Sequence, residues 1–341
     1  MKSIVLEQIG KISYRELQPE EDYQPTQEEE TEHGTKVITR HFGDPGPGEI
    51  ETEAVCGAVC THEVSLFLGD LTHPRYPMVP GHEAVHRVTR TGQGVTHVRE
   101  GDYIAACWYM GQWSRRVIGP ADMAYKLPDH MDDFSNWIIE PAASVVNAVW
   151  HMKIRPGDRV LLIGAGFMGL LMTQLVSHYP LAEFIACDVR PSSCNMAHIC
   201  GARETILLTS DAGKGRLDNL GPGYFDVVIE CSGTQSGLDL AVEFCGTGGK
   251  IYLFGWHRKR RSIDFKLGHL RGQQLVHTSP ALDTGREYER FWPKTIAMFE
   301  AGIFDLSVLM SHKYGSEDIA ACMSDSVERK DGFMKSCFYF E

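Results

Sequence analysis

The sequence predicts an α/β protein in which a small β-rich domain is joined to a doubly wound parallel sheet. Short apolar runs separated by glycine- and proline-containing turns fill the first third of the chain, as in a compact β core. From Asp158 onward, strand-like apolar runs alternate with helical segments, which is typical of a parallel sheet covered by helices. The chain has 341 residues, which is enough to bury two separate cores.

The first third supplies the expected strands of the β-rich domain, with turn signals at 45–48 and 101–102. The expected strands are the runs 1–7, 50–59, 84–89 and 102–107. An acidic stretch, residues 16–32, interrupts them with eight acidic side chains and no lysine or arginine. This stretch is compatible with a solvated loop and, alternatively, with a lid or a partner surface.

The rest of the chain supplies the elements of the parallel sheet. The expected strands are 159–163, 183–188, 226–231, 250–255 and 274–279. The expected helices between them are 169–177, 192–200 and 237–244. A helix at 291–301 and a final strand at 335–340 follow.

Composition excludes several classes of protein. The net charge of -12 and the pI near 5.7 argue against nucleic acid or an anionic membrane as partners. No apolar run approaches the ~20 residues of a membrane span, and the first residues lack the long apolar stretch of a signal peptide. Ten cysteines stand singly, several of them inside apolar runs, as expected for buried thiols in a reducing compartment. We therefore expect a cytoplasmic protein.

A glycine-rich turn predicts a dinucleotide site. Gly164, Gly166 and Gly169 enclose Ala165, Phe167 and Met168 in a G-x-G-x-x-G pattern that follows a strand and opens a helix. These glycines allow a tight turn, the approach of a pyrophosphate and close helix packing, while the helix start faces the phosphates.

Asp188 ends the second strand, where its carboxylate can accept hydrogen bonds from ribose hydroxyls and repel a 2′-phosphate. This favours NAD over NADP, although Arg190 nearby could accommodate that phosphate. Ser232 and Phe254, which follow the next strands, complete the expected cofactor-binding residues.

Four residues with metal-binding side chains form the second pattern. Cys60, the pair His82-Glu83 and Glu140 offer sulfur, imidazole and carboxylate ligands, the mixture found in catalytic zinc sites with one open position. Taken singly, Cys60 reads as a core thiol, His82 as a capping or core histidine, and Glu140 as a helix cap. The order of these residues along the chain, together with the glycine turn, favours a metal site over these structural interpretations.

The chain resembles the zinc-containing medium-chain dehydrogenase/reductase superfamily over nearly its whole length. The matching motifs are Pro45-Gly46-Pro47-Gly48-Glu49, the run 56–60, Pro80-Gly81-His82-Glu83, Gly101-Asp102, Glu140-Pro141, the glycine turn, the run 226–233 and Gly248-Gly249-Lys250. The resemblance implies a GroES-like catalytic domain at 1–150 and 285–341, and a Rossmann NAD-binding domain at 151–284. It also implies that Cys60, His82 and Glu140 bind zinc, with Glu83 exchanging as a ligand or orienting the site. A carboxylate at 140 is similar to the polyol and sorbitol dehydrogenase branch.

Three departures from the family pattern concern the proton path, the number of metals and the acidic stretch. The family carries Ser or Thr two residues after the zinc cysteine, whereas this chain has His62, preceded by Thr61. Either side chain could take the alcohol proton: His62 directly, or Thr61 through a shifted turn. Only Cys107 stands where many relatives have a four-cysteine lobe, so one catalytic zinc and no structural zinc are expected. The acidic stretch is an insertion.

The substrate pocket is expected to be aromatic. Phe67, Trp108, Tyr109, Trp113 and Trp256 are candidates for its lining, although any one of them could equally be a core residue. The basic run 257–261 is either a solvated loop or a holder of an anionic substrate group such as a phosphate or carboxylate.

The sequence thus predicts a zinc-dependent, NAD-linked dehydrogenase of a secondary alcohol, namely a polyol, sugar or cyclitol. The alternatives are a zinc-free reductase of an activated double bond and a non-enzymatic nucleotide-binding protein on the same fold. The expected partners are a small-molecule alcohol or ketone and a second copy of the chain, in a homodimer or homotetramer. In the proteins that this chain resembles, the strand matching 274–279 pairs with its copy.

Overall fold

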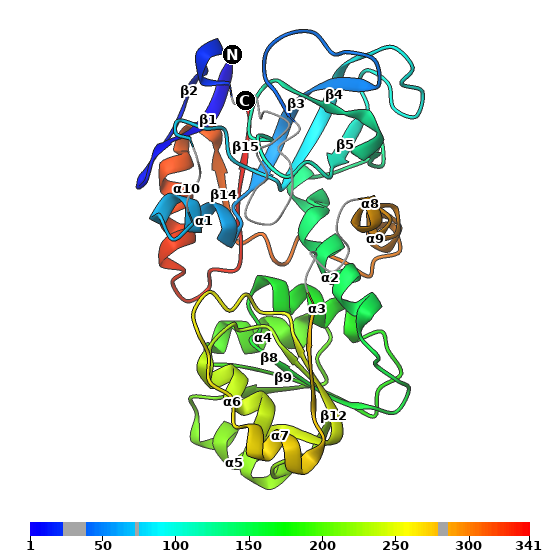
Figure 1. Cartoon of the computed structure of the whole chain (residues 1–341), viewed down its shortest axis with the longest axis vertical. Helices are drawn as coiled ribbons and strands as arrows, with labels where there is room; N and C mark the ends of the chain where they lie inside the picture. Colours follow the sequence, from blue (N-terminus) through cyan, green and yellow to red (C-terminus); the bar gives the residue numbers. More distant parts are fainter. Residues whose placement is uncertain (23–38, 72–74, 279–285) are drawn as a thin grey trace. The chain divides into compact units, whose positions relative to one another are not determined.

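A computed structural model describes residues 1–22, 39–71, 75–278 and 286–341, which form two compact units (Figure 1). The first, here the β-rich unit, comprises Met1–Ala143, Gly285–Glu300 and Asp305–Glu341. The second, here the parallel-sheet unit, comprises Ser144–Thr284 and Ala301–Phe304. The boundary between them falls between Ala143 and Ser144, inside the continuous helix α2 (Glu140–His151), which also contains the predicted boundary at residue 150.

The β-rich unit is built around one large sheet. Within the described residues, it has seven strands in the order β14-β15-β3-β4-β5-β7, with β6 also paired to β3. All neighbours are antiparallel except β14 and β15. Its strands are β3 (Glu49–Ala58), β4 (Ala84–Thr91), β5 (Tyr103–Ala106), β6 (Val117–Pro120), β7 (Ala124–Lys126), β14 (His312–Gly315) and β15 (Ser336–Tyr339).

A separate hairpin and several helices complete this unit. The hairpin pairs β1 (Lys2–Gln8) with β2 (Lys11–Glu16). The helices are α1 (Thr61–Leu68), α8 (Arg286–Glu289), α9 (Phe291–Glu300) and α10 (Ile319–Glu328). Strand β3 ends at Ala58, one residue earlier than predicted, and this leaves Cys60 as the N-cap of α1.

The acidic stretch predicted for residues 16–32 lies largely outside the described residues, which stop at Asp22 and resume at Thr39. The part that is described is not a freely solvated loop. Asp22 is 6% exposed and accepts hydrogen bonds from the backbone N–H of His41 and from its ring, at 2.9 and 2.7 Å. Glu21 forms a two-pronged ion pair with Arg15.

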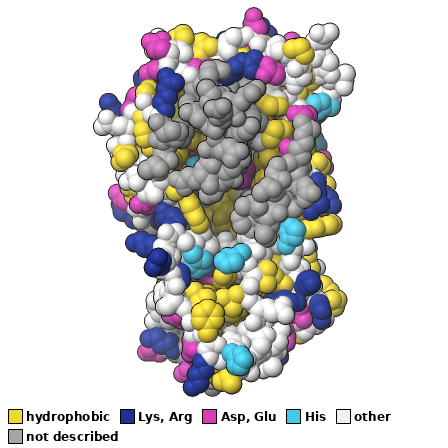
Figure 2. All heavy atoms as spheres, in the orientation of Figure 1, with side chains coloured by type: hydrophobic (Ala, Val, Ile, Leu, Met, Phe, Trp, Pro, Cys, Tyr) yellow, Lys and Arg dark blue, Asp and Glu magenta, His cyan; other side chains and the backbone are white. Residues whose placement is uncertain are grey.

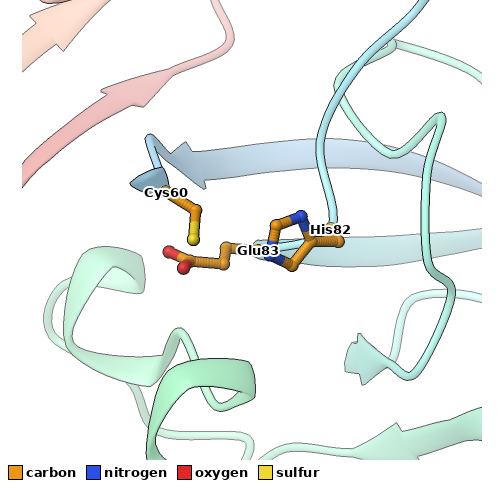
Figure 3. Close-up of side chains that lie close together, drawn as sticks. All are labelled: Cys60, His82 and Glu83. Atoms are coloured by element: carbon orange, nitrogen blue, oxygen red, sulfur yellow. The ribbon is translucent and has the colours of Figure 1, made fainter. Parts of the chain in front are cut away.

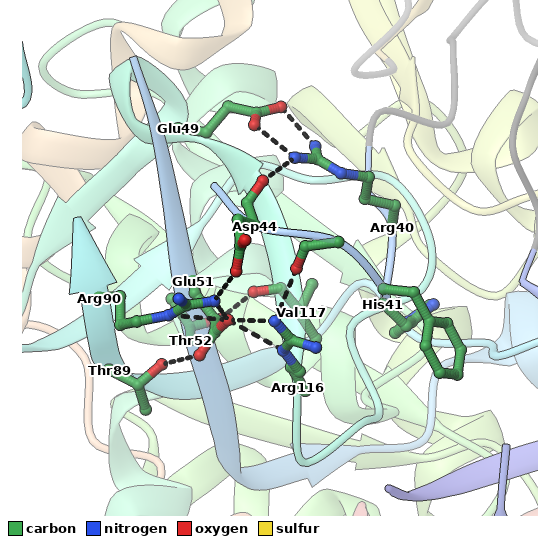
Figure 4. Close-up of polar contacts among 12 residues, drawn as sticks. Arg40, His41, Asp44, Glu49, Glu51, Thr52, Thr89, Arg90, Arg116 and Val117 are labelled. Carbon is green, nitrogen blue, oxygen red and sulfur yellow. Dashed lines mark hydrogen bonds and ion pairs between the residues drawn. The ribbon is translucent and has the colours of Figure 1, made fainter. Parts of the chain in front are cut away.

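A buried carboxylate in β3 organises the polar side of the sheet (Figure 4). Glu51 is 9% exposed and accepts hydrogen bonds from Arg90 at 2.6 Å, Arg116 at 2.7 Å and the Thr89 hydroxyl at 3.0 Å. Burial opposes ionisation, but the two guanidinium groups outweigh it and lower the pKa of Glu51.

We expect Glu51→Ala to lower the free energy of unfolding by about 1–3 kcal/mol, because two arginines lose their shared acceptor. Because the pKa of Glu51 is lowered on folding, the stability that Glu51 contributes is fully present above its unfolded-state pKa of ~4.3. That contribution is lost as the pH falls through the pKa of Glu51 in the folded protein. Urea unfolding at pH 7 and pH 3 measures both effects. Glu317→Ala is the control, because Glu317 is exposed and pairs only at the surface with Lys2. Equal losses in the two variants would contradict this account of Glu51.

The parallel-sheet unit is a doubly wound α/β structure. Among the described residues, six strands lie in the order β10-β9-β8-β11-β12-β13, and every pair is parallel. The strands are β8 (Arg159–Ile163), β9 (Glu183–Asp188), β10 (Glu204–Leu207), β11 (Phe225–Glu230), β12 (Cys245–Leu253) and β13 (Gln274–His277). The helices are α3 (Phe167–Val176), α4 (Pro191–Ile199), α5 (Asp211–Leu220), α6 (Gln235–Phe244) and α7 (Phe265–Arg271).

The order of strands marks where a ligand binds. The chain runs outward from β8 through β9 to β10, and then returns to β11 on the other side of β8. In doubly wound sheets, ligands bind at the carboxyl ends of the strands beside such a reversal. The loops after β8 and β11 therefore frame the candidate dinucleotide site.

The surface is charged with both signs. Figure 2 shows lysine and arginine side chains interspersed with aspartate and glutamate over the visible face, outside the grey atoms. Among the described residues, no helix has the length and apolar character needed to cross a membrane.

Candidate metal and dinucleotide sites

Three predicted metal ligands come together in the β-rich unit (Figure 3). Cys60, His82 and Glu83 each place one possible ligand atom so that all three atoms lie within 4.8 Å of one another. Antiparallel pairing brings them together, because Gly57 near the end of β3 faces Ala84 at the start of β4. Sulfur, imidazole and carboxylate in this arrangement fit a zinc ion.

Gly81 shapes the turn that presents His82. Its φ of +101° lies in the left-handed region, and a Cβ there would stand 2.2 Å from the ring of Trp113. Trp113 is fully buried and makes an edge-to-face contact with Phe338 at 4.9 Å. A side chain at position 81 would therefore displace the ring of Trp113, which packs against the turn that carries His82.

Glu63 orients the imidazole of His82. Its carboxylate is 1% exposed, lies 2.7 Å from His82 Nδ1, and accepts a hydrogen bond from the Cys60 backbone at 3.2 Å. Burial opposes its charge, but His82 and His62 hold the pKa of Glu63 well below its usual range. With Nδ1 directed at Glu63, the Nε2 atom of His82 remains for a metal, an arrangement common among metal-binding histidines.

Lys335, which precedes β15, supplies a buried positive charge to the same site. Its Nζ atom lies 2.6 Å from Glu83 Oε2, and the two side chains are 6% and 1% exposed. Burial opposes the charge of Lys335, but the charges of Glu83 and Cys60 raise its pKa. Glu83 is thereby held by a cation on one side while it faces Cys60 and His82 on the other.

The charge state of Cys60 depends on whether a metal ion is bound. Burial, followed by the negative charge of Glu83, raises the pKa of the thiol. A divalent cation reverses this balance, because metal coordination favours the thiolate.

Glu140, predicted as a further ligand, is not among the three residues whose ligand atoms converge. It begins α2 in the β-rich unit and accepts a hydrogen bond from the Tyr288 hydroxyl at 3.2 Å. Burial raises the pKa of the Cys107 thiol, and the charge of Glu140 raises it further while His82 lowers it. Glu140 and His82 thus both influence the pKa of the Cys107 thiol. The role of Glu140 as a metal ligand stays a prediction.

The two candidate proton acceptors have different surroundings. The Nε2 atom of His62 lies 3.1 Å from the Tyr109 hydroxyl, and its ring makes an edge contact with that of His82 at 5.6 Å. The Thr61 hydroxyl instead accepts a hydrogen bond from Arg329 at 2.8 Å. His62, Glu63 and His82 also form a second group with metal-binding atoms in mutual reach, and it shares His82 with the first.

Two of the predicted substrate contacts need correction. Trp108 and Trp113 are 1% and 0% exposed and belong to hydrophobic cores, so they do not line an accessible pocket. Phe67 is partly buried against one of these cores, whereas Trp256 in the other unit is 44% exposed. Tyr109 does reach the proposed metal ligands, because its ring stacks on that of His82 with the ring centres 6.3 Å apart.

The glycine turn of the parallel-sheet unit is shaped as predicted. Gly164 has a φ of +94°, and a Cβ there would lie 2.7 Å from the Ser232 backbone nitrogen. A Cβ on Gly169 would lie 2.0 Å from the Gly164 carbonyl oxygen. A Cβ on Gly166 would meet only Arg190, at 3.9 Å, so this position faces open space. No side chain caps the start of α3, which begins at Phe167, and the turn therefore fits a pyrophosphate.

Asp188 ends β9 beside this turn. It is 8% exposed and accepts hydrogen bonds from the backbone N–H groups of Ala165 at 2.8 Å and Arg190 at 2.9 Å. Its carboxylate is therefore fixed next to the glycine turn.

The remaining expected cofactor residues lie in the first turn of α3 or just after neighbouring strands. Met168 is in the first turn of α3, Ser232 is exposed after β11, and the Phe254 backbone N–H bonds the Glu230 carbonyl at 2.9 Å.

Glu63 and Lys335 are site residues that were not predicted from the sequence. Glu63 stands three residues after Cys60, and this N-cap spacing could have suggested it. Lys335 carries no local signal, because only the pairing of β15 with β3 brings its neighbourhood to Cys60.

Comparisons with known proteins identify the family of the chain. A family model described as alcohol dehydrogenase GroES-like domain matches residues 46–129, and one described as zinc-binding dehydrogenase matches residues 168–293. The L-threonine 3-dehydrogenase of Anaeromyxobacter sp. (strain K) is 24% identical over 304 residues, covering 80% of this chain and 86% of that protein. The sorbitol dehydrogenase of Arabidopsis thaliana is 24% identical over 315 residues, covering 79% and 82%.

Solved structures show the same fold. An Escherichia coli oxidoreductase of unknown specificity has a TM-score of 0.81 and 20% identity, covering 100% of this chain and 99% of that one. A candidate zinc-binding dehydrogenase from Sinorhizobium meliloti 1021, bound to NADP, has a TM-score of 0.80 and 19% identity, covering 99% and 98%. The galactitol-1-phosphate dehydrogenase of Escherichia coli has a TM-score of 0.79 and 18% identity, covering 99% and 100%.

Proposed function

The chain belongs to the zinc-containing medium-chain dehydrogenase/reductase superfamily and is an alcohol oxidoreductase, and on that premise we propose that it oxidises a secondary alcohol of a polyol, sugar or cyclitol with NAD, or runs the reverse reaction. The observation that carries the proposal is the convergence of Cys60, His82 and Glu83 within 4.8 Å. The names of the sorbitol and galactitol-1-phosphate dehydrogenases support a polyol-like substrate.

Each part of the proposed site has a separate task. A bound zinc ion supplies positive charge that favours loss of the alcohol proton, and NAD supplies the hydride acceptor. Glu63 keeps the ring of His82 in place, and Lys335 holds Glu83. His62, beside Tyr109, is the group proposed to receive the alcohol proton. The Gly164–Gly169 turn holds the pyrophosphate, and Asp188 holds the ribose.

The direct test follows NADH formation with polyols, aminocyclitols and simple alcohols, together with elemental analysis of the purified protein. One zinc per chain and NADH formation with a secondary alcohol are the expected results. A protein that binds no zinc but reduces activated double bonds with NAD(P)H would instead be the zinc-free reductase. A protein that binds NADH and turns over neither class would be the non-enzymatic alternative.

We predict that NAD is preferred over NADP because of Asp188. Repulsion between its carboxylate and a 2′-phosphate is worth on the order of 1–4 kcal/mol in a partly screened site. Asp188→Ala should lower the ratio of kcat/KM with NAD to kcat/KM with NADP by about tenfold or more. Asp188→Asn is the sharper variant, because it removes the charge and keeps an acceptor for the Ala165 N–H. Comparable kcat/KM values for both cofactors in the wild type would refute this assignment.

The proposed assembly is a homodimer, or a tetramer built from such dimers, formed through β13. Among the described residues, β13 pairs only with β12, which leaves one strand edge open. The neighbouring helix α7 exposes Phe265 and Leu270 by 76% and 70%, and an apolar hollow beside them includes Leu275 of β13. A second copy would cover this apolar surface and the open edge. A monomeric mass by light scattering at micromolar concentration would overturn this proposal.

A further inference from the structure

The loop after β12 carries a pair of cations that the proposed reaction has not used. We propose that Lys259 and Arg260 bind an anionic group, a phosphate or a carboxylate, on the alcohol substrate. The inference rests on the proposed function and narrows its substrate class to anionic polyols or sugars.

A fully buried carboxylate fixes this loop. Glu230, the last residue of β11, is 0% exposed and accepts hydrogen bonds from the backbone N–H groups of Ser232 at 2.8 Å and Gly233 at 3.0 Å. The Nε2 atom of His257 lies 2.8 Å from the other oxygen of Glu230. The loop after β12 therefore lies against the loop after β11.

A second anchor lies at the far end of the loop. Arg261 donates from Nε to His257 Nδ1 at 3.3 Å, and from Nη2 to the Gly233 carbonyl. The two loops are closely packed, because a Cβ on Gly255 would lie 2.4 Å from the Gly233 nitrogen. Residues 258–260 are therefore held between two fixed points, and their backbone needs little further ordering to bind a ligand.

The cations between these anchors are exposed and lack carboxylate partners. Lys259 and Arg260 are exposed, and no acidic side chain of the described chain lies within 4.0 Å of their charged groups. Arg258 stacks over the exposed ring of Trp256 at 5.6 Å. Arg216 of the same unit, by contrast, pairs with Glu204 at 2.7 Å. Two unpaired cations on a fixed loop of a chain with a net charge of -12 form a local anion site.

The strand order separates this anion site from the cofactor phosphates. The pyrophosphate turn follows β8 and the ribose carboxylate ends β9, whereas the basic loop follows β12 on the other side of β8. A dinucleotide bound across the reversal between β8 and β11 places its phosphates at β8 and its nicotinamide toward β11 and β12. The anion recognised at β12 therefore belongs to the molecule that reacts with the nicotinamide.

The test compares two double variants of equal charge. Lys259→Ala/Arg260→Ala removes the proposed site. Lys153→Ala/Arg155→Ala removes two exposed cations from the loop before β8, at the opposite, amino edge of the same sheet. The values of kcat/KM are measured with NAD and sorbitol 6-phosphate, D-gluconate or sorbitol, so that phosphate, carboxylate and neutral substrates are compared.

We expect the wild type to prefer an anionic substrate. The 259/260 variant should lose ~10-fold or more of kcat/KM on that substrate and little on sorbitol, while the 153/155 variant behaves as wild type. A higher kcat/KM for sorbitol 6-phosphate identifies the recognised anion as a phosphate, and a higher kcat/KM for D-gluconate identifies it as a carboxylate. Equal losses in the two variants, or a wild type that prefers sorbitol, would overturn the inference and leave the proposed dehydrogenase activity intact.

A binding measurement keeps the inference testable if none of these alcohols reacts. Calorimetry of inorganic phosphate with the NAD-saturated protein should show binding that the 259/260 variant loses and the 153/155 variant keeps. Unchanged phosphate binding in the 259/260 variant would refute the site. Weaker NADH binding in that variant would assign the cations to the cofactor and also refute it.

Discussion

Replacing Cys60 by alanine is expected to abolish alcohol oxidation and to remove zinc from the protein. Cys60 supplies the only sulfur among the three converging ligands, and the remaining His82 and Glu83 are a weak set for zinc. The variant should still bind NADH with wild-type affinity, because the Gly164–Gly169 turn and Asp188 belong to the parallel-sheet unit. Elemental analysis, NADH fluorescence titration and the NADH-formation assay measure the three effects.

Cys56→Ala is the matched control for Cys60→Ala. Cys56 is also a cysteine near the end of β3, but it is 0% exposed and is not among the converging ligand residues. We expect this variant to keep zinc and turnover, with some loss of stability from the removed buried atom. A Cys60→Ala protein that retained one zinc per chain and wild-type turnover would show that the metal is held elsewhere.

His62→Ala is expected to lower kcat by ~10²-fold or more, with the zinc content unchanged. The His62 imidazole lies in the ring cluster with His82 and Tyr109, so it is beside the proposed metal ligands without being needed to hold the ion. Thr61→Ala should change kcat little, because its hydroxyl serves as an acceptor for Arg329. Steady-state kinetics at saturating NAD, with zinc analysis of each variant, separates the two residues.

The opposite pattern would reassign the proton path. If Thr61→Ala is the crippling change and His62→Ala raises only KM, the hydroxyl receives the proton and His62 contacts the substrate. Tyr109→Phe tests the arrangement independently, because it removes the hydroxyl that lies 3.1 Å from His62 Nε2 and keeps the ring. A moderate fall in kcat is expected if that contact orients His62.

The elements that could be read from the sequence are those whose ends coincide with an abrupt change in residue type. Strand β8 ends at Ile163 because Gly164 adopts a positive φ, and β9 ends at Asp188, as both runs predicted. Strand β12 was predicted from Lys250 to Gly255 but extends from Cys245 to Leu253. Three glycines at 246, 248 and 249 obscured its first half, since glycine is a weak strand former.

The candidate site was only partly readable for a different reason. Cys60, His82 and Glu83 could be grouped because their residue types and order point to one chemistry. Trp108 and Trp113 could not be placed, because a tryptophan side chain suits a core and a pocket equally. Lys335 acts through its contact with Glu83, and that contact depends on tertiary packing that leaves no periodic trace in the sequence.

The ion pair between Glu83 and Lys335 also joins two residues that are far apart in the order of synthesis. Lys335 directly precedes β15, and β15 takes its place between β3 and β14. The strands β8 to β13 are all made before this, from one continuous stretch of chain. A growing chain can therefore complete its dinucleotide turn while Glu83 still lacks its cation. The whole parallel-sheet unit is thus synthesised before Lys335, the residue that pairs with Glu83.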